Sequence, residues 1–99
     1  MSKRKVTWDK QALNYFRESI RYIRQDSPQN ADKVKTEVLE KINELSTRPE
    51  IHNPDKYKRN NNGTYRAFEL HRLRVGYLVK EEEIIIARVR NTNQEPLDY

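Results

Sequence analysis

Residues 64–99, TYRAFELHRLRVGYLVKEEEIIIARVRNTNQEPLDY, contain three runs of alternating apolar and polar residues separated by short breaks. Such runs, rich in β-branched and aromatic residues, are typical of strands, and short connections favour antiparallel neighbours. The stretch therefore predicts a three-stranded antiparallel meander. Five arginines recur among the residues that must build its core, which makes it a cationic sheet: Arg66, Arg72, Arg74, Arg88 and Arg90.

Strict alternation assigns the side chains of the second and third runs to faces. In residues 72–80 it separates Arg72, Arg74, Gly76 and Leu78 from an apolar set, Leu73, Val75, Tyr77 and Val79. In residues 84–90 it groups Ile85, Ala87 and Val89 against Ile84, Ile86, Arg88 and Arg90. Glu81 to Glu83 are expected to form the turn between these runs. Residues 65–71 fit neither frame cleanly, so alternation does not decide which face Arg66 joins.

Two helices are predicted ahead of the meander. After a short strand candidate at residues 5–8, Asp9 is placed to cap a helix over residues 10–25, and Ser27 and Pro28 suit the start of a second helix that runs to residue 45 or 46. Apolar residues recur at steps of three and four in both. The prediction is an α+β fold within one domain spanning residues 1–99: N-terminal strand, antiparallel helix hairpin and three-stranded meander.

Residues 47–63 contain two prolines, an asparagine run and a glycine, which predicts a long loop. The loop is basic, through Arg48, Lys56, Lys58 and Arg59, and is either a substrate-facing loop or a connector. The tail from Asn91 onward, which includes Pro96, is expected to lie extended on the body of the domain.

Composition narrows the function classes. The chain has no cysteine, and His52 and His71 have no partner at metal-ligand spacing, so neither a metal nor another cofactor is expected. It has no apolar stretch that could span a membrane and no apolar signal segment, which favours a cytoplasmic protein. A net charge of +5 favours nucleic acid or an acidic protein as partner.

Three local patterns resemble the RelE/ParE superfamily of bacterial toxins, from type II toxin–antitoxin systems. They are IRYIRQDSPQNA at residues 20–31, GTYRAFELHRLRVGY at residues 63–77 and IARVRNTNQEPLDY at residues 86–99. The resemblance implies a microbial-ribonuclease-like fold and a cognate antitoxin, often acidic, that wraps the toxin with a helix and a strand. Superfamily members either cut mRNA on the ribosome or poison DNA gyrase.

The resemblance also implies site residues for an enzyme. Metal-independent RNA cleavage requires a base, a cation beside the phosphate and an acid. By position, Arg66 and Arg74 match the superfamily's first lysine of the second strand and its third-strand arginine, and Tyr99 matches the terminal tyrosine. At two other positions this chain differs from the family pattern. Phe68 stands where family members have a lysine that acts as base, and Asn91 stands where a histidine is common. Neither side chain can take the proton.

The remaining candidate bases are Glu69 and His71, and Arg88 or Arg90 is the candidate second cation. The candidate contacts to nucleic acid or another target are Lys56, Lys58, Arg59, Arg72, Arg88 and Arg90. A structural role is the alternative: the arginines could pair with Glu50, Glu69 or Glu95, and Tyr99 could simply pack.

The vacated base positions and the helix hairpin favour the ParE side. The expected function is that of a toxin that arrests growth by binding a macromolecular target, DNA gyrase first, and is neutralised by a cognate antitoxin. The alternative is a ribosome-dependent mRNA endonuclease. Both depend on guanidinium groups being available on the sheet face that the helices leave open.

Overall fold

The computed structural model describes residues 3–94 and 97–99. The elements follow in the order β1 (Lys5–Trp8), α1 (Lys10–Asp26), α2 (Pro28–Glu44), β2 (Tyr65–Leu70), β3 (Leu73–Val79) and β4 (Glu83–Asn91). The predicted α+β order of strand, helix hairpin and meander is confirmed. Glu83 begins β4 rather than closing the turn. Among the described residues, no helix combines the length and apolarity needed to cross a membrane.

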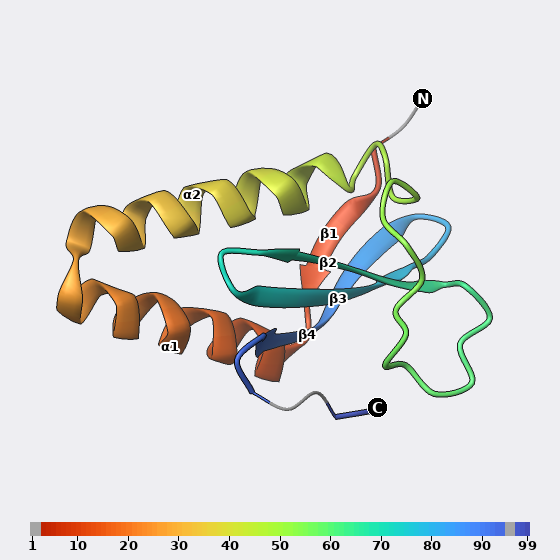
Figure 1. The fold of residues 1–99 in the computed structure, drawn as a ribbon. Helices are drawn as coiled ribbons and strands as arrows, with labels where there is room; N and C mark the ends of the chain where they lie inside the picture. Colours follow the sequence, from red (N-terminus) through yellow and green to blue (C-terminus); the bar gives the residue numbers. More distant parts are fainter. Residues whose placement is uncertain (1–2, 95–96) are drawn as a thin grey trace.

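Local sequence explains where the helices begin. The side chain of Asp9 accepts hydrogen bonds from the backbone N–H groups of Gln11 and Ala12, which caps α1. Ser27 ends α1 and caps α2 through the N–H of Asn30, and Pro28 occupies the first turn, where its missing N–H is not needed. The one-residue connection sets the two helices side by side as an antiparallel pair (Figure 1).

The four strands form one sheet in the order β1-β4-β3-β2. The β2–β3 and β3–β4 pairs are antiparallel, as expected of a meander, whereas β1 lies parallel to β4, with Val6 opposite Ile84 and Trp8 opposite Ile86. In Figure 1 the helix connection and the long segment before β2 lie at opposite ends of the molecule.

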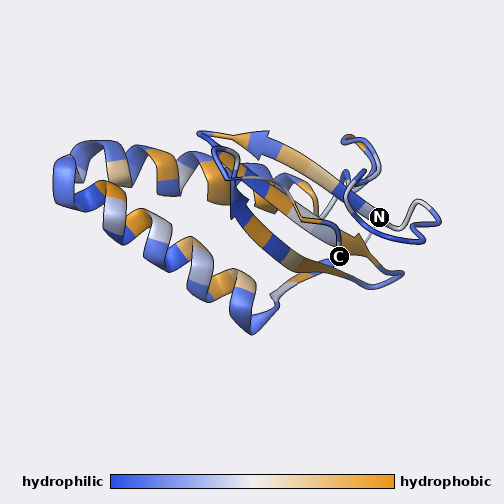
Figure 2. Ribbon diagram, turned by 60° about the horizontal axis from the view of Figure 1, so that its bottom comes forward, coloured by the Kyte–Doolittle hydropathy of each residue, from blue (hydrophilic) through white to orange (hydrophobic). Residues whose placement is uncertain are grey.

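The core lies between the helix pair and one face of the sheet. The buried residues of each helix recur at steps of three and four, and Figure 2 shows hydrophobic and hydrophilic residues alternating along both helices. The largest fully buried side chains come from α2, the segment after it and the meander: Val38, Leu45, Val75, Tyr77, Ile84, Ile86 and Val89. The helices therefore cover one face of the sheet and leave the other to the remaining segments.

The prediction that side chains alternate strictly between the two faces along β4 is wrong. Gly76 pairs with Arg88 and Tyr77 with Ile86, so Ala87 is an extra residue in a β-bulge. Because the bulge shifts the alternation by one residue, Ile84 and Ile86 share the buried face with Val89: all three are fully buried. Without it, Arg88 and Arg90 would point into the core beneath the helices. With it, they lie on the open face beside Gly76 and Arg74.

The pairing of β2 with β3 shows on which face of the sheet Arg66 lies. Arg66 pairs with Tyr77 and Phe68 with Val75, so both lie on the helix-covered face, while Glu69 pairs with Arg74 on the open face. The guanidinium of Arg66 donates to the carbonyl of His52 at 2.6 Å. Arg66 and Arg74 are therefore on opposite faces of the sheet.

The segment before β2 is irregular but fixed to the sheet. Pro54 forms a bridge with Arg66, the N–H of Asp55 donates to the carbonyl of Tyr65, and the N–H of Ala67 donates to the carbonyl of Asn53. The side chain of Asn61 adds hydrogen bonds to the backbone of Asp55, Gly63 and Tyr65. The predicted loop thus folds along the edge of β2 and over the open face.

The end of the tail lies on the body, as expected. The N–H of Tyr99 donates to the carbonyl of Tyr57 at 2.9 Å, and the N–H of Arg59 donates to the carbonyl of Tyr99 at 2.7 Å. Pro96, and the Glu95 named above as a pairing partner, lie outside the described residues.

Candidate functional site

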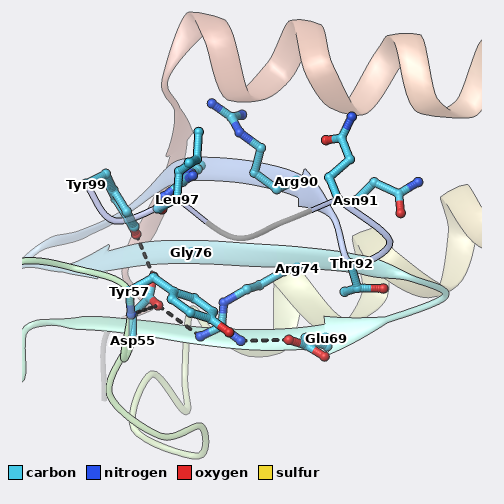
Figure 3. Close-up of a pocket in the computed structure, with 12 residues that line it drawn as sticks. Asp55, Tyr57, Glu69, Arg74, Gly76, Arg90, Asn91, Thr92, Leu97 and Tyr99 are labelled. Atoms are coloured by element: carbon cyan, nitrogen blue, oxygen red, sulfur yellow. Dashed lines mark hydrogen bonds and ion pairs between the residues drawn. The ribbon is translucent and has the colours of Figure 1, made fainter.

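A cavity of about 240 Å³ opens on the face of the sheet that the helices leave uncovered (Figure 3). Strands β3 and β4 form its floor, and the segment before β2 and the tail form its walls. Its lining is polar and cationic: Asp55, Tyr57, Glu69, Arg74, Gly76, Arg88, Arg90, Asn91, Thr92, Gln94, Leu97 and Tyr99.

Asp55 is the centre of the hydrogen-bond network in this cavity. Its side chain is 2% exposed and accepts from the Tyr99 hydroxyl at 2.7 Å, from Arg74 Nη2 at 2.9 Å and from the backbone N–H of Tyr57 at 3.1 Å. Arg74 Nη1 also donates to Glu69 at 2.8 Å, as the dashed lines in Figure 3 show. One buried carboxylate thus joins the tail, β3 and the segment before β2.

The network determines which charges are stable. Burial disfavours ionisation of Asp55, but the hydrogen bonds from Tyr99, Arg74 and the Tyr57 N–H outweigh it, so the pKa of this carboxyl lies below its ordinary value. Burial likewise opposes the charge of Arg74, yet the hydrogen bonds to Asp55 and Glu69 raise its pKa. Both groups are therefore ionised and tied to each other.

Gly76 makes room for Tyr99. A Cβ atom at position 76 would lie 2.5 Å from the Tyr99 hydroxyl oxygen, too close for any contact, and 3.0 Å from Asp55 Oδ2, a tight contact. Burial, followed by the hydrogen bond to Asp55, raises the pKa of Tyr99, so its hydroxyl keeps its proton and donates. Tyr99 is packed, in agreement with the structural alternative, and it lines the cavity as well.

Arg88 and Arg90 differ from Arg74. Among the described residues, neither forms an ion pair with a carboxylate. The guanidinium of Arg88 lies 4.5 Å from the centre of the Tyr99 ring, and that of Arg90 lies 5.2 Å from the Tyr15 ring. Arg88 donates one N–H to the carbonyl of Leu97, while its Nε is buried with no acceptor. Burial and then the charge of Arg90 lower the pKa of Arg88.

The segment before β2 also carries cations, of which Lys58 lies beside Tyr99 of the cavity. Lys58 Nζ lies 4.7 Å from the centre of the Tyr65 ring and 5.5 Å from that of Tyr99. Arg59 follows it and bonds through its backbone to Tyr99, and Lys56 lies over the Tyr57 ring at 5.3 Å. The structure thus brings Arg74, Arg88 and Arg90 to one cavity, with Lys58 beside its Tyr99, whereas Lys56 lines a neighbouring pocket and Arg59 is tied to Tyr99 through its backbone.

Three of the predicted site residues lie elsewhere. Arg66 is on the helix-covered face. His71 and Arg72 form the turn between β2 and β3, with Arg72 exposed and His71 Nε2 2.7 Å from Glu37 of α2. They line a different surface groove beside the helix hairpin. Of the two candidate bases, only Glu69 reaches the cavity, and its side chain is 53% exposed.

Sequence reasoning missed Asp55, Tyr57 and the role of Gly76. One signal was present: Asp55 is the only acidic residue between Ile51 and Phe68, in an otherwise basic loop. A lone carboxylate among cations is a candidate for an internal ion pair, but its partner on β3 could not be chosen without the fold. Among the described residues, no group of histidine and acidic side chains is arranged to hold a metal ion.

Comparison with protein-family models matches residues 6–96 to the family described as "ParE toxin of type II toxin-antitoxin system, parDE". A search of the curated proteins found no match.

Proposed function

Because the chain belongs to the ParE toxin family of type II toxin–antitoxin systems, in which a cognate antitoxin is the partner, we propose that it arrests growth by binding DNA gyrase. The family match includes five of the six elements in full and all of β1 except Lys5. The choice of gyrase over the ribosome comes from the chemistry of the cavity.

One observation supports this choice: both carboxylates that line the cavity are ion-paired with Arg74. A ribonuclease needs a proton acceptor beside a cation that is available to the phosphate. Here Arg74 is 18% exposed and already binds Asp55 and Glu69. The family position of the base is Phe68, which is 5% exposed and part of the core. These groups hold the tail and sheet together and leave target binding to the surface.

Induced expression in bacteria tests the proposal. We expect cleaved DNA to accumulate in complex with gyrase and the SOS response to follow, with no codon-positioned cuts when cellular mRNA is mapped by primer extension. Cuts at fixed codon positions, without DNA cleavage, would assign the protein to the ribosome instead.

Arg88→Gln with Arg90→Gln tests whether the open face of the sheet contacts the target, because neither side chain has a carboxylate partner among the described residues. We expect toxicity to be lost while circular dichroism still reports a folded chain. Full toxicity of the folded variant would move the contact to the helix hairpin.

A specific observation keeps ribosome-dependent mRNA cleavage as the second candidate: Glu69 lies in the same cavity as Arg74, Arg88 and Arg90. If Glu69 leaves Arg74, it can act as base, while Arg88 and Arg90 face the phosphate and Tyr99 stacks on a base. Glu69→Gln separates the candidates, with the exposed Glu81→Gln as control. Gyrase binding predicts that both variants stay toxic; RNA cleavage predicts that only Glu69→Gln is inactive.

A further inference from the structure

Unpaired cations occur on several parts of the described chain, including Lys10 and Arg17 on α1, but five of them are carried by β4 and the segment before β2. On the helices, Arg21 pairs with Glu18 and Arg24 with Asp32. No such pair is formed by the side chains that we call the loop–tail surface: Lys56, Lys58, Arg59, Arg88 and Arg90. Lys56, Lys58 and Arg59 come from the segment before β2, and Arg88 and Arg90 come from β4; backbone hydrogen bonds between Tyr99 and residues 57 and 59 hold the tail between them.

Aromatic rings hold several of these cations in place. Lys58 and Arg88 both lie within 6 Å of the centre of the Tyr99 ring, and Lys56 lies over Tyr57. A ring face orients a cation without neutralising its charge. The side chains of the loop–tail surface are therefore positioned, yet their charge and most of their N–H groups stay available to an anion from outside.

The charge of this surface is not balanced internally. With Arg74 it holds six cations, whereas the carboxylate side chains that line the cavity are those of Asp55 and Glu69. Arg88 is an example: its buried Nε has no acceptor among the described residues, and burial, followed by the charge of Arg90, lowers its pKa. An oxyanion bound here would relieve the repulsion and could supply the acceptor.

We propose that the loop–tail surface binds the phosphate backbone of duplex DNA directly, so that the toxin contacts the DNA held by gyrase as well as the enzyme. The inference rests on the proposed function, which supplies the DNA, and it adds a second ligand to it. Arg88 and Arg90 bind phosphate oxygens at the cavity, and Lys56, Lys58 and Arg59 bind neighbouring phosphates along the strand.

Duplex DNA fits this surface better than an acidic protein does. Protein–protein interfaces have an apolar centre from which lysine is depleted, whereas DNA-binding surfaces are polar and strongly positive. Among the described residues, the large exposed apolar side chains near the loop–tail surface are Leu97 of the tail and Ile51 of the segment before β2; Tyr22 and Leu39 lie on the helices. DNA also presents a phosphate charge about every 1.7 Å of its axis, so scattered cations all find partners.

Fluorescence anisotropy of a labelled duplex of about 20 base pairs, titrated with the purified chain at about 50 and 200 mM salt, tests the proposal without gyrase. We expect Arg88→Gln with Arg90→Gln to raise Kd about tenfold and to lower the salt slope by about two. Lys56→Gln with Lys58→Gln should do the same without removing the Arg88 contact to the tail.

The matched control is Arg17→Gln with Arg21→Gln, which removes the same charge from the exposed side of α1 and should leave Kd within about twofold. Equal losses in the control and the loop–tail variants would overturn the proposal. So would tighter binding of single-stranded RNA, or binding of poly-glutamate in place of DNA.

Capture of the wild-type chain by DNA-free gyrase, measured in parallel, tests the proposed function by itself. Gyrase binding without DNA binding would refute the DNA contact and leave gyrase as the target. DNA binding with the expected variant pattern but without gyrase binding would support the surface and refute gyrase.

Discussion

At the scale of single residues, Asp55 and Gly76 decide how the tail is seated. Asp55 is a buried carboxylate whose partners come from three parts of the chain, and Gly76 leaves the space into which the Tyr99 hydroxyl fits. Neither residue need touch a target. Their substitution tests the architecture of the cavity separately from the function.

Asp55→Asn should lower the free energy of unfolding by about 3 kcal/mol at neutral pH, because it leaves Arg74 facing a neutral amide in a buried site. Urea denaturation measures the loss. Asp98→Asn, at a neighbouring exposed carboxylate, should change stability by less than about 0.5 kcal/mol. Equal, small effects of the two substitutions would contradict the central role of Asp55.

The stability difference between the wild type and Asp55→Asn should depend on pH. Because the folded-state pKa of Asp55 lies below its ordinary value of 3.8, its charge stabilises the fold above that pH. The contribution is lost as the pH falls through the lower, folded-state pKa. Denaturation curves from pH 7 downward should therefore keep a constant difference until about pH 4 and converge below it.

Gly76→Ala should destabilise the chain by about 1–3 kcal/mol, because the new methyl group collides with the Tyr99 hydroxyl. In a Tyr99→Phe background the nearest ring atom is Cζ at 3.6 Å, so the cost should fall by about 1 kcal/mol. Thermal denaturation of the wild type, the two single variants and the double variant gives the coupling free energy between positions 76 and 99. Additive effects would mean that Tyr99 does not occupy this position in solution.

At the scale of elements, the turn between β2 and β3 carries backbone strain. His71 and Arg72 both have positive φ, at 52° and 64°, the conformation that two-residue hairpin turns require and that glycine and asparagine adopt most easily. Arg72→Gly removes this strain but also makes the unfolded chain more flexible, which opposes folding. The net effect should be a stabilisation of about 0.5–1 kcal/mol. Arg72→Ala keeps the strain and should show no gain when both are measured by urea denaturation.

Periodicity predicted the helices and the order of the strands because apolar spacing and capping residues act over a few neighbouring positions. It failed in β4, where Ala87 forms a bulge that Gly76 of the adjacent strand accompanies. A bulge depends on the pairing of two strands, which single-strand alternation does not contain. Strand pairing also decides that Arg66 and Arg74 lie on opposite faces of the sheet, and it brings Asp55 to Arg74. Neither result could be obtained from the sequence of one strand.

At the scale of the whole molecule, a highly charged chain is stabilised by a small hydrophobic core. Charged residues make up 35% of the sequence and hydrophobic ones 34%, a composition for which a partner that binds only the folded state contributes much of the stability. The cognate antitoxin that the family implies is such a partner.

Saturation with the antitoxin should therefore raise the melting temperature in proportion to the logarithm of its free concentration. The gain is about 2.7 kcal/mol when the antitoxin is present at about 100 times its Kd. Differential scanning calorimetry at several antitoxin concentrations measures it. A melting temperature independent of concentration would mean that the antitoxin does not select the folded toxin.

The parallel pairing of β1 with β4 affects how the chain is made. Lys5 lies opposite Glu83, so the first strand has no partner until the last one has been synthesised and has left the ribosomal exit tunnel. A nascent chain at any earlier point has an open sheet edge at β3 and an unfinished core. A chain that ends before β4 should therefore lack both the completed sheet and the buried face of that strand.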